Sequence, residues 1–205
     1  MPRTADHDER RREVAGALIA VVARRGLGEA SLAVVAEEAG VSVGLIQRYF
    51  RSRRDLLQFA FDHLEVRAGE RLAAAVAVRR TGEPVRETAY TMLETLLPLD
   101  EERMAESVVW LAFLAAGTVD EELLAPHQAG MRYMHESIAA WIRQSTAAGT
   151  SPEQLDADFE ARLLTSLVDG LVIDMATNRK DITPESARRV LAAAVDRAFG
   201  VEGVR

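Results

Sequence analysis

One stretch constrains the fold of this chain more than any other: residues 31–50, SLAVVAEEAGVSVGLIQRYF. Apolar side chains recur in its first half at helical spacing, at Leu32, Val35, Ala36 and Ala39. Such spacing places them on one face of a helix and predicts a buried stripe. The second half, after a glycine, carries its own apolar pair one helical turn apart. The stretch therefore predicts two short helices separated by a tight turn.

The residues between these two helices are suited to end one helix and start the next. Ser31 precedes the first stripe, and its hydroxyl can accept a hydrogen bond from a free amide of the first turn. Gly40 ends that helix, because glycine adopts the left-handed conformation without a clash of a Cβ atom. Val41 then fills the space between the helices, and Ser42 caps the second helix, expected over residues 43–49. A helix, a short turn with glycine and a second helix form a helix-turn-helix.

The second helix leaves an unusual set of side chains outside. Ile46 and Phe50 lie one turn apart and are expected to face inward. The outward face then holds a small residue near the helix start, an amide and a cation, from Val43, Gly44, Gln47 and Arg48. Such a face suits the major groove of DNA, where a recognition helix presents its N-terminal end to base edges. An ordinary helical hairpin in a core is the alternative, and the flanking sequence decides between the two.

Composition favours an almost entirely helical protein. The chain has 205 residues, of which 48% are apolar, and few stretches alternate with period two. It holds no cysteine, which excludes disulfides, thiolate metal sites and a cysteine nucleophile and fits a cytoplasmic protein. No apolar run approaches the roughly 20 residues that span a bilayer, and the charged N-terminus lacks the apolar core of a signal peptide. We therefore expect a cytoplasmic protein without a membrane partner.

Charge is unevenly distributed along the chain. The net charge is −7, yet residues 1–55 hold ten basic and eight acidic side chains, and the remainder holds 15 and 24. The cations of the first part flank the helix-turn-helix, as Arg10, Arg11 and Arg12 before it and Arg48, Arg51, Arg53 and Arg54 in and after it. A solvated surface would explain them, but their position favours contacts with phosphates.

The expected architecture is all-α, with about nine helices. An N-terminal domain of three helices is expected over residues 1–55 and a larger helical domain over residues 56–205. The seventh helix is expected to be interrupted or kinked near Pro126 and Gly130. The first three helices are expected at about residues 8–25, 32–39 and 43–49. The fourth is expected to begin at residue 52 and to end between residues 71 and 78. The remaining five are expected at about residues 84–97, 101–116, 120–148, 154–177 and 184–199.

The flanks identify a resemblance. An arginine-rich first helix, the run Ala39-Gly40-Val41-Ser42, the pair Tyr49-Phe50 and the sequence Asp55-Leu56-Leu57 resemble the TetR family of bacterial repressors over residues 8–62. Arg53 stands where that family usually has a lysine. Further on, Trp110-Leu111-Ala112-Phe113 and residues 167–171 resemble the branch typified by the choline-responsive repressor of the betaine pathway.

The resemblance implies a homodimer. Residues 1–55 would bind double-stranded DNA, and residues 56–205 would bind an effector and form the dimer, with the last two helices of each subunit in a four-helix bundle. The eighth helix is apolar around much of its circumference, so it must be buried on several faces. A central helix of a monomer explains that pattern nearly as well. The interface residues expected are Phe159, Leu163, Leu167, Leu171, Val195 and Phe199.

The resemblance also assigns roles at the DNA. Gln47 is the first candidate for reading a base, because an amide can pair with both edge atoms of adenine. Leu45 is expected at a thymine methyl, and Val43 and Gly44 at the closest approach to the groove. Phosphates are expected at Ser31, Arg48, Tyr49 and Arg53, and the cap Ser42 is counted in the same interface. Gln47 and Arg48 differ from the residues common at these positions, so the operator sequence does not carry over.

Effector-binding candidates are methionine, aromatic and histidine side chains of the fifth to seventh helices, although core packing explains most of them equally well. Trp110 and Trp141 could bind a cation between them, because the faces of indole rings attract cations. Asp169 and Asp174 interrupt an apolar helix and are expected at a cationic effector, across the dimer or in water. The candidates are Met92, Met104, Trp110, Phe113, His127, Met131, Met134 and Trp141.

Other classes of function have little support in the sequence. It contains no phosphate-binding loop, no Gly-x-Ser-x-Gly and no His-Glu-x-x-His, and four histidines, so we expect no catalytic residues, cofactor or metal. A helical interaction module without DNA binding is less consistent with the basic cluster, and an activator is not separable from a repressor. The leading hypothesis is a repressor that an unidentified small-molecule effector releases from a palindromic operator.

Overall fold

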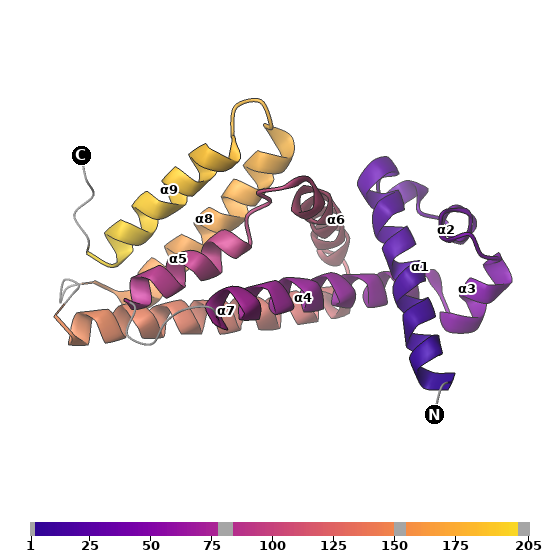
Figure 1. Ribbon diagram of the computed structural model, residues 1–205, viewed down its shortest axis with the longest axis horizontal. Helices are drawn as coiled ribbons and strands as arrows, with labels where there is room; N and C mark the ends of the chain where they lie inside the picture. Colours follow the sequence, from indigo (N-terminus) through magenta and orange to yellow (C-terminus); the bar gives the residue numbers. More distant parts are fainter. Residues whose placement is uncertain (1–2, 78–83, 150–154, 201–205) are drawn as a thin grey trace. The chain divides into compact units, whose positions relative to one another are not determined.

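The structure is a computed structural model that describes residues 3–77, 84–149 and 155–200 (Figure 1). These residues form helices without any strand, which confirms the expected all-α fold. The order is α1 (Arg3–Arg25), a short 3-10 turn η1 (Leu27–Glu29), α2 (Leu32–Ala39), α3 (Val43–Tyr49), α4 (Arg53–Ala77), α5 (Val85–Thr95), α6 (Glu101–Gly117), α7 (Glu121–Ala147), α8 (Ala157–Thr177) and α9 (Pro184–Ala198).

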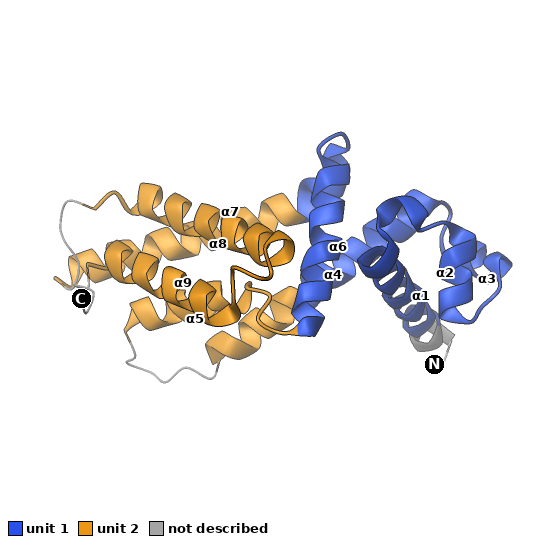
Figure 2. Cartoon of the chain, turned by 90° about the horizontal axis from the view of Figure 1, so that it is seen from above, with its two compact units in different colours: residues 1–67, 101–126 blue, residues 68–100, 127–205 orange. Residues whose placement is uncertain are grey.

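The chain forms two compact units, each assembled from separate segments (Figure 2). The first unit contains residues 1–67 and 101–126, and the second contains residues 68–100 and 127–205. The division expected between residues 55 and 56 concerns function and stays a prediction. Helices α4 and α7 each contribute residues to both units.

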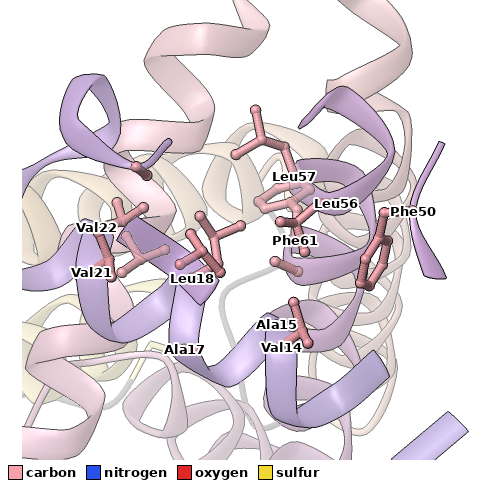
Figure 3. Packing of buried hydrophobic residues seen from close by; sticks show 14 of the residues in the cluster. Val14, Ala15, Ala17, Leu18, Val21, Val22, Phe50, Leu56, Leu57 and Phe61 are labelled. Carbon is pink, nitrogen blue, oxygen red and sulfur yellow. The ribbon is translucent and has the colours of Figure 1, made fainter. Parts of the chain in front are cut away.

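The first unit has one continuous core, to which α1, α4 and α6 contribute together with the helix-turn-helix. Val14, Leu18 and Val21 form a stripe on α1 and are 2%, 1% and 0% exposed, and Figure 3 shows them near Phe61 and neighbouring residues of α4. Phe61 stacks on Phe113 of α6, with 5.2 Å between the ring centroids. Helix α6 thus belongs to the core on which the helix-turn-helix is built.

The second unit is organised around α9, which contacts α5 and α8. Thr183 caps α9 through a reciprocal pair of bonds with Ser186, and Pro184 begins the helix where its missing N–H costs nothing. Leu191 and Val195 are both fully buried. The unit's polar edges carry ion pairs between elements, Arg86 with Asp196, Arg188 with Glu94 and Arg197 with Glu160.

Helix boundaries differ from expectation in a few places. Helix α1 begins at Arg3 rather than near residue 8, and α7 continues through Pro126 and Gly130 without interruption. A proline removes its own backbone donor and crowds the carbonyl four residues earlier, but Pro126 lies close to the start of α7, so most hydrogen bonds of this long helix come after it. Helix α8 begins at Ala157, where Asp156 caps it. The start expected for this helix at residue 154 lies outside the described residues.

No helix in the described part of the chain combines the length and the apolar character needed to cross a membrane.

Candidate nucleic-acid interface and effector residues

The turn between α2 and α3 has the geometry that its sequence predicts. Gly40 has φ 64° and ψ 31°, which is the left-handed conformation. The Gly40 amide donates to the Glu37 carbonyl at 3.2 Å, and the Val41 amide donates to the Ala36 carbonyl at 2.9 Å. This pair of bonds is a Schellman motif, which satisfies carbonyls at the end of a helix. The motif sets the direction in which the chain leaves α2.

Serine caps hold the starts of both helices. The Ser31 hydroxyl accepts from the Val34 amide at 3.3 Å, and the Ser42 hydroxyl accepts from the Leu45 amide at 3.2 Å. A cap of this kind contributes about 1 kcal/mol to a helix. Because α2 and α3 have only 8 and 7 residues, and isolated helices of that length are marginal in water, the caps and the core contacts together keep them formed.

Helix α3 separates its buried and exposed faces as predicted from its sequence. Ile46 is 0% exposed, and Phe50, just after the helix, is 2% exposed. Gly44, Gln47 and Arg48 are exposed, as is the cap Ser42, and Val43, Leu45 and Tyr49 are half-buried. The side chains of Gln47 and Arg48 make no hydrogen bond or ion pair with any other described residue. The outward face of α3 therefore offers an amide and a guanidinium that its own subunit does not use.

Tyr49 is held at the end of α3 by the first helix. Its ring meets the His7 ring edge-on, with 4.8 Å between the centroids and 68° between the planes. The contact positions the tyrosine at the margin of the exposed face.

Several cations of the basic cluster are used within the chain, which the sequence did not reveal. The Arg53 guanidinium donates from Nε to the Ala30 carbonyl at 3.1 Å and from a terminal nitrogen to the Leu27 carbonyl at 2.7 Å. Arg53 therefore has a structural role, and its expected phosphate contact stays a prediction that depends on its remaining N–H groups. Arg11 lies over two rings, 5.0 Å from the centroid of Phe50 and 4.2 Å from that of Phe59. Its side chain joins α1 to the start of α4.

Other arginines pair with carboxylates or remain exposed. Arg10 pairs with Glu13, and Arg54 binds Asp120 and Glu122. The side chains of the exposed residues Arg12, Arg48 and Arg51 have no acidic partner within the described ranges, although the backbone amide of Arg51 donates to the Asp55 carboxylate at 3.0 Å. These three are the cations best placed to meet phosphates.

The effector candidates from the sequence are divided between the two units. In the first unit, Phe113 is 0% exposed in the core, and Met104 and Trp110 are half-buried on α6. In the second unit Met92 and Met134 are buried, and His127, Met131 and Trp141 are half-buried. Burial lowers the pKa of His127, which favours its neutral form. Whether these residues bind an effector stays a prediction.

Glu65 is an effector candidate that the sequence did not reveal. It lies on α4 and is half-buried, and burial raises the pKa of its carboxyl group. A hydrogen bond with Trp110 of α6 lowers the pKa of this carboxyl group, and the neighbouring charge of Asp62 raises it. In the sequence, Glu65 looks like any charged residue on a long helix. The fold places its carboxylate beside an indole, a pairing that could hold a cation.

The dimer residues expected on α8 and α9 differ widely in exposure. Phe159 is 57% exposed, and Leu163 and Leu167 are half-buried. Leu171, Val195 and Phe199 are 6%, 0% and 1% exposed, so these three pack inside the unit and leave almost no area for a partner. Two residues that the sequence analysis did not single out, Ile173 and Val190, are 46% and 45% exposed. The exposed apolar side chains of α8 and α9 are therefore those of Phe159, Ile173 and Val190, and of these only Phe159 was expected at the interface.

The two aspartates of α8 have different environments. Asp169 is half-buried, and burial raises the pKa of its carboxyl group. Asp174 is exposed, and its carboxylate accepts a hydrogen bond from the side-chain amide of Asn178 at 3.2 Å, at the residue where the helix ends. Asp174 therefore has a local role, and Asp169 is the carboxylate whose burial is costly.

The sequence is similar to known families and proteins. Residues 16–59 match the family model for bacterial regulatory proteins of the TetR family, and residues 85–200 match the model for the C-terminal part of BetI-type transcriptional repressors. The chain is 29% identical to the HTH-type transcriptional regulator PksA of Bacillus subtilis, over 96% of this chain and 93% of that protein. It is 25% identical to the HTH-type transcriptional regulator BetI of Yersinia pestis, over 98% of each chain.

Solved structures show the same similarity. A transcriptional regulator from Rhodococcus is 28% identical, with a TM-score of 0.80, and the match covers 92% of this chain and 95% of that one. A regulator from Saccharomonospora viridis, solved in complex with choline, is 25% identical with a TM-score of 0.83, and the match covers 92% of this chain and 96% of that one.

Proposed function

The chain belongs to the TetR family of DNA-binding bacterial transcriptional regulators, and on that premise we propose that it is a homodimeric repressor that a small-molecule effector releases from a palindromic operator. The observation that carries the proposal is the outward face of α3. Gln47 and Arg48 are exposed there and make no hydrogen bond or ion pair with the rest of the described chain. An amide and a cation left unused at a helix surface suit base edges and phosphates.

A dimer follows from the limited reach of one such helix. One recognition helix reads only a few base pairs, and two-fold symmetry doubles the readout. The exposed apolar side chains of Phe159, Ile173 and Val190 on α8 and α9 support this pairing, because burying them against a second copy would remove apolar surface from water. As a DNA-binding regulator, the protein would act in the bacterial cytoplasm, where the chromosome lies.

Selection of genomic fragments by the purified protein, followed by footprinting, tests the DNA-binding part. The proposal predicts protection of a palindromic site, with two half-sites about one helical turn or more apart. A single protected half-site, or no protected site in any selected fragment, contradicts it.

We further propose that the effector is an organic cation of the quaternary ammonium class. Glu65 and Trp110 support this, because a carboxylate and an indole both attract a cation and both are half-buried. The neighbour from Saccharomonospora viridis that was solved with choline points to the same class. A bound cation would offset the free-energy cost of burying the negative charge of Glu65.

Calorimetric titration with choline chloride, at ionic strength matched by sodium chloride, tests the effector class. The Glu65→Gln variant should lose choline affinity by about tenfold or more, because a quaternary ammonium is held by charge alone, and the Coulomb attraction of a close pair near a protein surface reaches about 4 kcal/mol before the cost of desolvation is subtracted. Glu70→Gln removes a carboxylate from an exposed position of the same helix and should bind choline as the unaltered protein does. Equal losses in both variants, or no heat of binding in the unaltered protein, would refute the assignment.

A further inference from the structure

Two adjacent arginines at the start of α4 hold two different segments of the first unit. Arg53 donates to the carbonyls of Leu27 and Ala30, in the connection that leads into α2. Arg54 donates to the two carboxylate oxygens of Asp120 at 2.9 and 2.7 Å, and to Glu122 at 2.8 Å. Asp120 and Glu122 lie at the corner between α6 and α7. The first turn of α4 is thus bonded on one side to the entry of the helix-turn-helix and on the other to this corner.

The corner itself leaves little room for internal adjustment. A Cβ atom on Gly117, the last residue of α6, would lie 2.4 Å from Leu124, so the two segments are in close contact. Leu123 is 5% exposed and belongs to the core of the unit. The Asp120 amide donates to the Gly117 carbonyl at 3.0 Å, and the Asp120 carbonyl accepts from the Leu123 amide at 3.1 Å. A displacement of the α6–α7 corner therefore moves Asp120 with it.

The other end of the connection lies where α2 begins. Ala30 is 1% exposed, and the next residue is the cap Ser31. The carbonyls that Arg53 contacts are therefore the last anchoring points before α2, and α2 in turn sets α3 through the turn at Gly40. The η1 turn that contains Leu27 also contacts α6. A shift in the Arg53 guanidinium would alter the position from which the helix-turn-helix starts.

We propose that Asp120, Arg54 and Arg53 act as a clamp that transmits a displacement of the α6–α7 corner to the start of α2. The inference rests on the proposed function, because it assigns the contacts by which an effector changes the position of the recognition helix. The chain leaves the first unit along α7 directly after this corner. A movement of α7 consequently reaches Asp120 before any other residue of the clamp. Arg53 and Arg54 are positioning residues in this scheme.

The ion pairs of Arg54, which are the part of the clamp that the test removes, add little to the stability of the fold. The side chains of Arg54, Asp120 and Glu122 are 55%, 32% and 82% exposed, and exposed ion pairs contribute little because water and salt screen them. Bidentate geometry nevertheless fixes the direction of the Arg54 side chain. The clamp can therefore be removed without unfolding the protein, which makes a clean test possible.

Asp120→Asn is the informative variant. Asp120 directly precedes α7, and its carboxylate accepts hydrogen bonds from the backbone amides of Leu123 and Glu122. Asparagine keeps the shape of the side chain and caps helices about equally well, so α7 should still begin at the same residue. The substitution removes the Asp120 charge that Arg54 binds through two nitrogens, and it leaves the single contact of Arg54 with Glu122 in place. Glu121→Gln is the matched control, because it makes the same change in charge one residue later, at an exposed side chain with no interaction with other described residues. Thermal unfolding should show that both variants fold.

Hydrogen exchange of the free protein gives the first readout. The amides of Ala30, Ser31 and Val34 report on the entry of α2, about 90 residues away in sequence from the substitution. We expect Asp120→Asn to raise their exchange rates about two- to fivefold, the range that loss of an exposed ion pair allows. We expect Glu121→Gln to leave these rates unchanged. Equal exchange in Asp120→Asn and the unaltered protein, or equal increases in both variants, overturns the clamp.

Hydrogen exchange in the presence of operator DNA gives a second readout. A contact that only stabilises the fold would not change the effect of DNA on the exchange rates. Coupling is reciprocal, so operator binding should slow exchange at residues 118–123 in the unaltered protein and in Glu121→Gln. In Asp120→Asn the operator should still bind, and this slowing should be absent. If the operator slows hydrogen exchange at residues 118–123 equally in all three proteins, the clamp is refuted although the protein binds DNA. If the unaltered protein selects no duplex at all, the proposed function fails first, and the two failures are distinguishable.

Discussion

Replacing one glycine in the turn of the helix-turn-helix should destabilise the protein, whereas the same replacement in α1 should stabilise it. Gly40 has φ 64°, and a Cβ atom there would meet nothing within 4 Å. The cost of Gly40→Ala is therefore purely conformational. An L-residue in the left-handed region costs about 1–2 kcal/mol, and the lower entropy of the unfolded chain with alanine returns about 0.4–1 kcal/mol. The net loss should be about 1 kcal/mol.

Gly16 provides the matched comparison. It lies within α1, is exposed, and a Cβ atom there also meets nothing within 4 Å. Alanine is favoured over glycine in a helix interior by roughly 0.5–1 kcal/mol. The two alanine variants should thus differ by nearly 2 kcal/mol in their free energies of unfolding, with opposite signs relative to the unaltered protein.

Thermal unfolding at one fixed protein concentration measures the difference. For a chain of this size, 1 kcal/mol corresponds to about 2–4 °C in Tm. Gly40→Ala should melt about 2–4 °C lower than the unaltered protein and bind operator DNA more weakly, because the direction of α3 is set by this turn. Gly16→Ala should melt slightly higher and bind normally. An unchanged or raised Tm in Gly40→Ala would show that the turn does not require the left-handed conformation, and a lowered Tm in Gly16→Ala would contradict the comparison with α1.

The other predictions concern DNA contacts, the core and the pH dependence of stability. Gln47→Ala should relax the preference for the operator over mismatched duplexes, whereas Arg51→Ala should weaken binding to all duplexes and reduce the salt dependence by about one phosphate, as measured by titrations at two salt concentrations. Arg53→Ala should weaken binding to all duplexes and also lower Tm, because two backbone carbonyls lose their donor; an unchanged Tm would show that these bonds contribute nothing. Phe113→Ala should cost about 3–5 kcal/mol of stability in urea unfolding, because the side chain is fully buried against Phe61. Burial raises the pKa of Glu65, so its contribution to stability is present below the pKa of the unfolded chain and is lost as pH rises through the folded value; Glu65→Gln should therefore gain stability relative to the unaltered protein between pH 4 and pH 7, and a constant difference would contradict this.

Local patterns were sufficient to predict the helix-turn-helix. Ser31, Gly40 and Ser42 act on residues within four positions of themselves, so their roles follow from sequence alone. The buried residues of α1 and the inward position of Ile46 follow from helical spacing in the same way. The boundaries of α5, α6 and α9 also lie within two residues of those expected, because prolines, glycines and caps mark them.

Contacts between distant residues could not be predicted. Arg53, Arg54 and Arg51 look alike in the sequence, and all three are exposed. Only the fold separates the arginine bonded to carbonyls, the one bonded to Asp120 and the one whose side chain bonds no other described residue. Glu65 gains its environment from Trp110 on another helix.

The dimer residues illustrate a second limit. An apolar stripe predicts burial but does not distinguish burial within a subunit from burial between subunits. The sequence therefore grouped Val195, which is fully buried in its own unit, with Phe159, which is largely exposed.

The central claim is that two copies of α3, held by one dimer, read the two halves of a palindromic site. Binding of the purified protein to its selected operator should be compared with binding to the same operator in which about five base pairs, half a helical turn, separate the half-sites further. The insertion leaves every base contact of each half-site intact but turns the second half-site to the opposite side of the duplex. We predict that affinity falls to the level of a single half-site, about tenfold or more weaker. Equal affinity for the two duplexes would contradict paired recognition by the exposed face of α3.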